Sequence, residues 1–153
     1  MPAPVIVPDA SVLLKWGLSS PDERDRDLAL ALKESWLSGT CDLIVPSLWL
    51  YEVGNILIMK RPAEAEALLQ AIIDLDLEET RPALYLTSIL GLIRRFKVTF
   101  YDASYHGLAI ERGGLMLTAD EAYFRKTQRA GHVALLSNWP PPMSRPKRQS
   151  TGL

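Results

Sequence analysis

Two aspartates stand where the sequence predicts a strand giving way to a helix. Asp9 directly follows the apolar segment 5–8, and Asp120 follows the apolar segment 115–117 after a two-residue turn. An aspartate in this position has two interpretations. Its oxygens can accept hydrogen bonds from the free amides of the helix N-terminus, or its carboxylate can point into a site at the carboxyl edge of a sheet.

Two further acids follow a similar pattern. Glu52 lies early in a predicted helix that comes after the strand 41–45, and Asn55, three residues on, shares its face. Asp102 begins a predicted helix after the short extended segment 98–100. Right-handed crossovers place every strand-to-helix junction of a parallel sheet at one edge, so we expect all four carboxylates to converge there.

Convergence of like charges has an energetic consequence. Carboxylates a few Å apart disfavour joint ionisation unless a cation lies between them. Mg²⁺ and Mn²⁺ prefer such oxygen ligands, often together with substrate phosphate, and can activate a bound water for displacement at phosphorus. The acids therefore predict a divalent-metal site at which a phosphodiester could be hydrolysed.

Other familiar chemistries find no support in the sequence. His106 and His132 do not have the spacing of zinc ligands. Neither a glycine-rich phosphate-binding motif nor a nucleophile-elbow motif occurs.

The elements that must position the acids alternate between strands and helices. The strands are predicted at 5–8, 41–45, 74–78 (an edge strand), 115–117 and 132–136. The helices are predicted at 10–16, 22–38, 47–61 with Ser47 as its cap, 63–73, 82–96, 102–112 and from Asp120 onward. This order predicts an α/β fold with a mainly parallel central sheet and helices on both faces.

The 153 residues have the composition of an ordinary globular protein, and we expect one domain over residues 1–139. The Pro-rich tail, residues 140–153, carries three basic residues and no acid, and we interpret it as flexible.

The formal net charge is −1, so residues 1–142 carry −1 − 3 = −4, and a nucleic-acid ligand would need a local basic patch. The single cysteine, Cys41, fits a reducing cytoplasm, and we expect neither a signal peptide nor a membrane span.

Four segments together resemble the motifs of PIN-domain ribonucleases, especially VapC-type toxins. They are VPDASVLLKW (7–16), PSLWLYEVGNIL (46–57), TFYDASYHGLAIERG (99–113) and LTADEAYFRK (117–126). The resemblance covers nearly the whole chain, in the family's order. It implies a three-layer α/β/α PIN-like fold, an endoribonuclease site dependent on Mg²⁺ or Mn²⁺, and an antitoxin as partner. We also expect a homodimer.

The resemblance also assigns roles to individual residues. The family's four motif acids match Asp9, Glu52, Asp102 and Asp120, as catalytic residues and metal ligands. Three residues match frequent companions of these acids: Ser11, Asn55 and Thr118. Two positions depart from the family pattern, because Pro8 and His106 stand where aliphatic residues are expected.

Two alternatives belong to other functional classes. A receiver-type phosphoacceptor switch would need adjacent acids after the first strand and a lysine after the last one, and the sequence offers neither. A catalytically silent PIN-like binding module would be indicated by loss of a motif acid, and all four are present. We also interpret His106 as a packing residue rather than a catalytic base. A large apolar surface around residues 49–59 and 63–73 predicts burial by a second copy or by the antitoxin.

Overall fold

The computed structural model describes residues 2–18 and 23–140, and their strands form one parallel sheet. The strands are β1 (Val5–Pro8), β2 (Asp42–Pro46), β3 (Glu78–Thr80), β4 (Leu115–Thr118) and β5 (Val133–Leu135). Their order across the sheet is β3-β2-β1-β4-β5, so β1 is central. This arrangement confirms the predicted α/β class with a parallel sheet.

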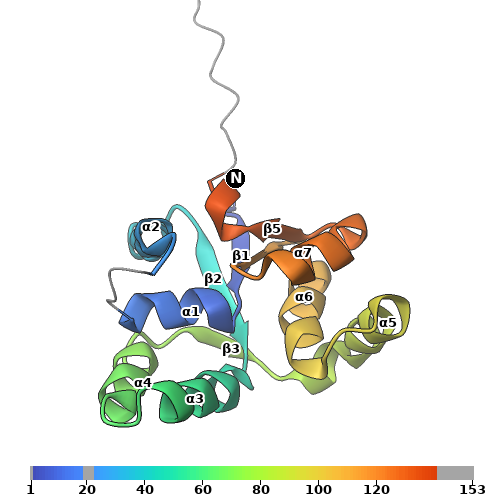
Figure 1. The fold of residues 1–153 in the computed structure, drawn as a ribbon. Coiled ribbons are helices and arrows are strands. Elements are labelled where there is room, and N and C mark those ends of the chain that lie inside the picture. Colours follow the sequence, from blue (N-terminus) through green and yellow to red (C-terminus); the bar gives the residue numbers. More distant parts are fainter. Residues whose placement is uncertain (1, 19–22, 141–153) are drawn as a thin grey trace, which may run out of the picture.

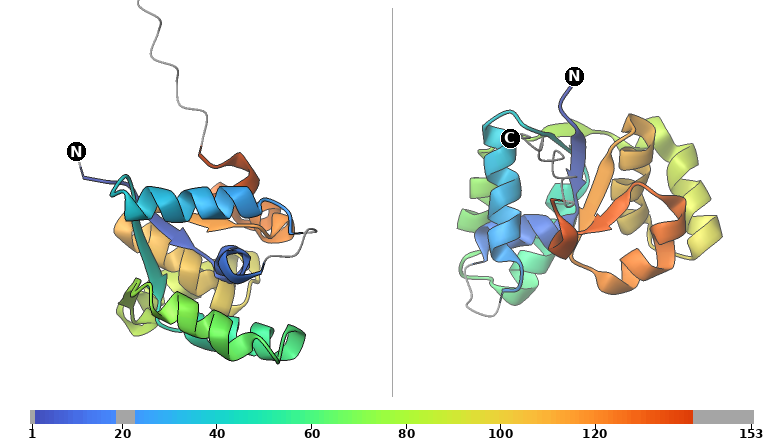
Figure 2. Two further views of the ribbon diagram at one scale, coloured as in Figure 1. Left: turned by 90° about the vertical axis from the view of Figure 1, so that its left-hand side faces the viewer. Right: turned by 90° about the horizontal axis from the view of Figure 1, so that it is seen from above.

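Helices cover both faces of the sheet and give three layers (Figures 1 and 2). One side carries α1 (Ala10–Gly17), α2 (Arg26–Leu37), α3 (Trp49–Lys60) and α4 (Ala65–Ile73). The other side carries α5 (Leu86–Phe96), α6 (Phe100–Arg112) and α7 (Glu121–Thr127). Short 3₁₀ turns complete the described elements: η1 (Pro82–Tyr85), η2 (Gln128–Ala130) and η3 (Leu136–Asn138).

The core is built around β1 and α6. The side chains of Val7 and Leu13 are fully buried, and α6 is buried without interruption from Ala103 to Ala109 because it packs between the sheet and α5. Gly107 permits the close approach of α5, since a Cβ at this position would lie 3.1 Å from Cγ1 of Ile89. Apolar burial of this extent is the main stabilising contribution to such a domain.

The prediction that Ser47 caps the helix after the second strand is wrong for a tertiary reason. Ser47 does not cap α3, which begins at Trp49 with no side-chain cap. The amide of Ser47 instead donates to the carbonyl of Thr80 (2.9 Å) and so continues the pairing of β2 with β3. That contact joins residues far apart in the sequence, and local helix-capping preference cannot anticipate it.

The third strand begins four residues later and ends two residues later than predicted. Residues 74–76 complete the end of α4, with the amide of Asp76 donating to the carbonyl of Ile73 and its backbone left-handed at φ +53°. The paired residues are therefore Glu78–Thr80, and β3 is an edge strand as predicted.

Other boundaries move by a few residues, and part of one prediction cannot be compared. Helix α2 begins at Arg26, and residue 22 of its predicted range lies outside the described residues. Residues 141–153 of the predicted tail also lie outside them. No helix in the described part of the chain is both long enough and apolar enough to cross a membrane.

Candidate active site

The site lies where the direction of winding reverses. Strands β1 and β4 are neighbours, with Pro8 opposite Leu117, and the chain leaves β1 for one face of the sheet and β4 for the other. In open parallel sheets such a reversal leaves a crevice at the carboxyl ends of the strands. Asp9 and Asp120 follow these two strands directly or within two residues, as the sequence predicts.

Asp9 is buried at the start of α1 and is tied to the end of β4. Its Oδ1 accepts hydrogen bonds from the amide of Val12 (3.2 Å) and from the hydroxyl of Ser11. The same hydroxyl of Ser11 accepts from the amide of Ala119 (2.9 Å). Burial raises the pKa of Asp9 to about 6, although these hydrogen bonds and one from Thr118 oppose the shift. The capping and site interpretations are therefore compatible for this residue.

Glu52 is half-buried in the first turn of α3. The hydroxyl of Tyr105, on α6, donates to its Oε1 across 3.1 Å. Burial raises the pKa of Glu52 to about 7, with further contributions from the charges of Asp102 and Asp9, while the Tyr105 hydrogen bond lowers it. Near neutral pH this carboxyl is therefore poised between its charged and neutral forms.

Asp102 lies inside the first turn of α6 and does not cap that helix. The cap is Thr99, whose hydroxyl accepts from the amide of Asp102 (3.1 Å), so the predicted helix start at Asp102 is two residues late. This leaves the carboxylate free of a capping role. Burial, and then the charge of Asp120, raises the pKa of Asp102, while the Thr99 hydrogen bond lowers it.

Asp120 caps α7 and faces the same cavity as Asp102. Its Oδ1 accepts from the amide of Tyr123 (3.0 Å), and its own amide donates to the buried hydroxyl of Thr118 (3.0 Å). Asp102 and Asp120 both line a cavity of about 220 Å³. Asp120 is thus a helix cap on the wall of the crevice, and its exposure leaves it accessible to a ligand.

Asp102 is the common electrostatic neighbour of the other three acids. Its charge raises the pKa of Asp9 and of Glu52, and its own pKa is raised by the charge of Asp120. The fold thus brings all four carboxylates to one edge of the sheet, near enough for their charges to affect one another. Repulsion of this kind is relieved by proton uptake or by a cation.

The carboxylate oxygens suit a hard cation, although the described residues do not form a complete ligand group. Every candidate donor is a carboxylate oxygen, which is the ligand type that Mg²⁺ and Mn²⁺ prefer. Among residues 2–18 and 23–140, no three His, Cys, Asp or Glu side chains already form a group that could hold a metal ion. Mg²⁺ commonly binds through one or two carboxylates, completing its shell with water and substrate phosphate. The acids therefore fit such an ion in composition, and pairs of them could hold it.

The companion residues differ in their relation to the acids. Ser11 and Thr118 both contact the chain at the acidic edge, as described above. Asn55 is exposed, and within residues 23–140 it makes no hydrogen bond to Glu52. The sequence interpretation missed Tyr105, although its position three residues after Asp102 places both on one side of α6.

His106 is a structural residue, as the sequence interpretation had it. It is fully buried, with Nδ1 2.8 Å from the hydroxyl of Tyr123 and Nε2 2.8 Å from the carbonyl of Gly131. A carbonyl can only accept, so Nε2 carries the proton, and a neutral ring then accepts at Nδ1 from Tyr123. Both nitrogens are occupied, and burial lowers the pKa of His106, so the ring has no free base for catalysis.

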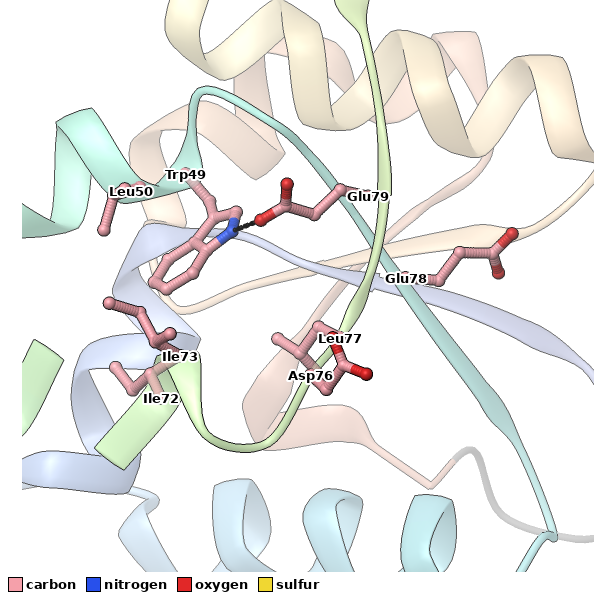
Figure 3. A pocket seen from close by; sticks show the side chains of 8 residues that line it. All are labelled: Trp49, Leu50, Ile72, Ile73, Asp76, Leu77, Glu78 and Glu79. Carbon is pink, nitrogen blue, oxygen red and sulfur yellow. Dashed lines mark hydrogen bonds between the residues drawn. The ribbon is translucent and has the colours of Figure 1, made fainter. Parts of the chain in front are cut away.

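A second cavity of about 550 Å³ lies between α3, α4 and β3 (Figure 3). Its wall combines apolar side chains with an acidic side, and the indole Nε1 of Trp49 donates to Oε1 of Glu79 across 2.6 Å. None of the four crevice acids lines this cavity. It is therefore separate from the candidate active site.

The fold is a three-layer α/β/α domain with four acids at the carboxyl edge of its parallel sheet. Comparison with known proteins identifies the family of this domain. Residues 6–130 match the PIN domain, so the chain belongs to the PIN domain family. That assignment confirms the resemblance noted in the sequence and leaves no place for a receiver-type switch. A search of curated proteins found no significant match.

Solved structures share the fold at low sequence identity. PAE2754 from Pyrobaculum aerophilum is 22% identical, with a TM-score of 0.61 over 90% of this chain and 93% of that one. A toxin–antitoxin complex from Klebsiella pneumoniae is 12% identical (TM-score 0.63, 86% and 97% covered). Mycobacterium tuberculosis VapC20, described as a sarcin–ricin loop cleaving toxin, is 19% identical (TM-score 0.59, 84% and 96% covered).

Proposed function

We propose that the protein is an endoribonuclease dependent on Mg²⁺ or Mn²⁺ and the toxin of a toxin–antitoxin pair. The observation that carries the proposal is that four acids stand at the helix starts along one edge of a PIN fold, Asp9 and Asp120 as caps of α1 and α7 and Glu52 and Asp102 in the first turns of α3 and α6. The description of VapC20 as a sarcin–ricin loop cleaving toxin agrees with the proposed function.

In this proposal the chain's own residues hold the cation and orient its ligands. Asp9, Glu52, Asp102 and Asp120 are the metal ligands, and the bound cation supplies water activation and charge neutralisation at the phosphate. Tyr105 fixes the orientation of the Glu52 carboxylate, and Ser11 holds the β1–α1 and β4–α7 junctions together. Burial raises the pKa of Asp9 and of Glu52, and a bound cation would favour their charged forms.

The proposed partners are a second copy of the chain and an antitoxin. Large apolar side chains are exposed on α3 and at the end of α4, and patches of this kind commonly mark interaction sites. They are Tyr51 (72% exposed), Ile58 (59%), Met59 (76%) and Ile73 (42%). The Klebsiella pneumoniae neighbour is itself a toxin–antitoxin complex.

The direct test is cleavage of RNA by the purified protein with Mg²⁺, Mn²⁺ or EDTA. We expect internal cleavage with either cation and none with EDTA. A catalytically silent PIN module would bind its partner and leave RNA intact under all three conditions. Induced expression should arrest growth, and co-expression of its antitoxin should relieve that arrest.

A further inference from the structure

The acidic crevice has a basic side. Lys97, just after α5, and Lys126, on α7, line the same 220 Å³ cavity as Asp102 and Asp120. The Nζ of Lys126 donates to the backbone carbonyl of Lys97 across 3.2 Å, so the end of α5 and α7 are joined at this point. Two acidic and two basic residues thus line one small cavity.

The two lysines belong to a larger basic patch, which we define as the exposed basic residues of segments 94–97 and 125–129. No acid occurs in residues 94–101 or 122–132, although residues 1–142 as a whole carry −4. Within residues 23–140 no member of the patch forms an ion pair with a carboxylate. The members are Arg94, Arg95, Lys97, Arg125, Lys126 and Arg129. The patch therefore supplies the local positive field that a polyanion would need on an otherwise acidic protein.

We propose that Lys97 and Lys126 bind the RNA phosphate next to the one cleaved, with the rest of the basic patch guiding the backbone toward the crevice. This inference rests on the proposed nuclease function and names the residues that position its substrate. An RNA backbone approaching Asp102 and Asp120 meets like charge, and adjacent cations offset that repulsion. A lysine ammonium binds phosphate as a compact charge without requiring one orientation.

The salt dependence of RNA binding separates this role from a structural one. Each phosphate neutralised on a single strand contributes about 0.7 to the slope of log K against log salt concentration. If Lys126 serves only to hold the carbonyl of Lys97, its loss should lower thermal stability and leave that slope unchanged.

The experiment measures binding of a short single-stranded RNA by fluorescence anisotropy, in EDTA and over a range of KCl concentrations. We expect Lys97→Gln and Lys126→Gln each to reduce the slope, by no more than about 0.7 because the two lysines share one phosphate, and to weaken binding at low salt. Lys126→Arg should keep the wild-type slope because it keeps the charge. Lys60→Gln, an exposed lysine at the end of α3, is the matched control and should also keep it. The inference would be overturned if both Gln variants had the same slope as Lys60→Gln. It would also be overturned if the wild type did not bind RNA.

RNA cleavage assays on the same variants distinguish the proposed nuclease function from the proposed phosphate site. Lysine-dependent RNA binding without cleavage in Mn²⁺ would remove the nuclease function and leave the phosphate site standing. If the wild type cleaves RNA, and Lys97→Gln and Lys126→Gln are as active as Lys60→Gln at all salt concentrations, the phosphate site is contradicted. The nuclease function is then supported.

Discussion

The hydroxyl of Tyr105 donates a hydrogen bond to Oε1 of Glu52 and so joins α6 to α3 across the acidic crevice. The two residues are 53 positions apart in the sequence. Because the bond favours the charged carboxylate, it partly offsets the burial that raises the pKa of Glu52. Tyr105 therefore affects both the orientation and the protonation of one candidate metal ligand.

Replacing Tyr105 with Phe should shift the pH dependence of cleavage to higher pH. Without the hydrogen bond the pKa of Glu52 rises above about 7, so more of the protein is protonated and inactive at neutral pH. Rates measured from pH 6 to 9 should fall at the acidic end and recover at the alkaline end. Tyr85→Phe is the control, because its buried hydroxyl has no hydrogen-bond partner among the described residues. Superimposable pH profiles for Tyr105→Phe and wild type would contradict this role.

Ser11→Ala should reduce both stability and cleavage. The change removes a donor to Asp9 and leaves the amide of Ala119 without its hydroxyl acceptor, at a cost of about 1–3 kcal/mol. Urea unfolding measures the first effect and RNA cleavage the second. Ser104→Ala is the comparison, since among the described residues its hydroxyl bonds only to the carbonyl of Phe100 within α6, and it should leave cleavage intact. Equal cleavage by the two variants would argue against a positioning role for Ser11.

The metal-free protein should become more stable as the pH falls from 7.5 to 5.5. The folded-state pKa values of Asp9 and Glu52, about 6 and about 7, lie above the ordinary values of 3.8 and 4.5. At these two carboxyls the folded state therefore binds more protons than the unfolded state in this window, and together they outweigh His106, whose lowered pKa acts in the opposite direction. Stability is lost as the pH rises through the folded-state values of the two acids. Thermal melts in EDTA should show this rise, and Glu52→Gln should reduce it. A melting temperature that falls on acidification over this range would contradict the shifts.

Met59→Glu should weaken assembly without affecting the crevice. Met59 is 76% exposed near the end of α3, and a charge there would oppose burial of the proposed contact surface. Sedimentation of the protein alone and with its antitoxin should show the loss of one association. Leu37→Glu, at an exposed apolar position on α2, should leave both associations unchanged. Wild type that stays monomeric at micromolar concentration, alone and with the antitoxin, would contradict the assignment of this surface.

Much of the fold follows from local patterns, and the acidic edge follows from topology. Asp9 and Asp120 were predictable because a parallel sheet places all its strand-to-helix junctions at one edge. The roles of Tyr105 and of the Ser47 amide were not, because each depends on a partner many residues away, Glu52 and Thr80 respectively. The start of α6 was misplaced because two capping candidates, Thr99 and Asp102, lie three residues apart, and the hydroxyl rather than the carboxylate takes the position. Tertiary contacts decide between such locally equivalent choices.

We infer that the four acids form one cation site that includes Asp102, and Asp102→Asn removes one charge from that site. Thermal melts with and without Mn²⁺ should be run beside an RNA cleavage assay. Wild type should gain stability with Mn²⁺, by about 2.7 kcal/mol at a concentration 100 times the Kd. The variant should gain much less, should cleave RNA orders of magnitude more slowly, and without metal should be at least as stable as wild type, because one repelling charge is gone. A metal-free variant less stable than wild type, with an unchanged response to Mn²⁺ and intact cleavage, would contradict the claim.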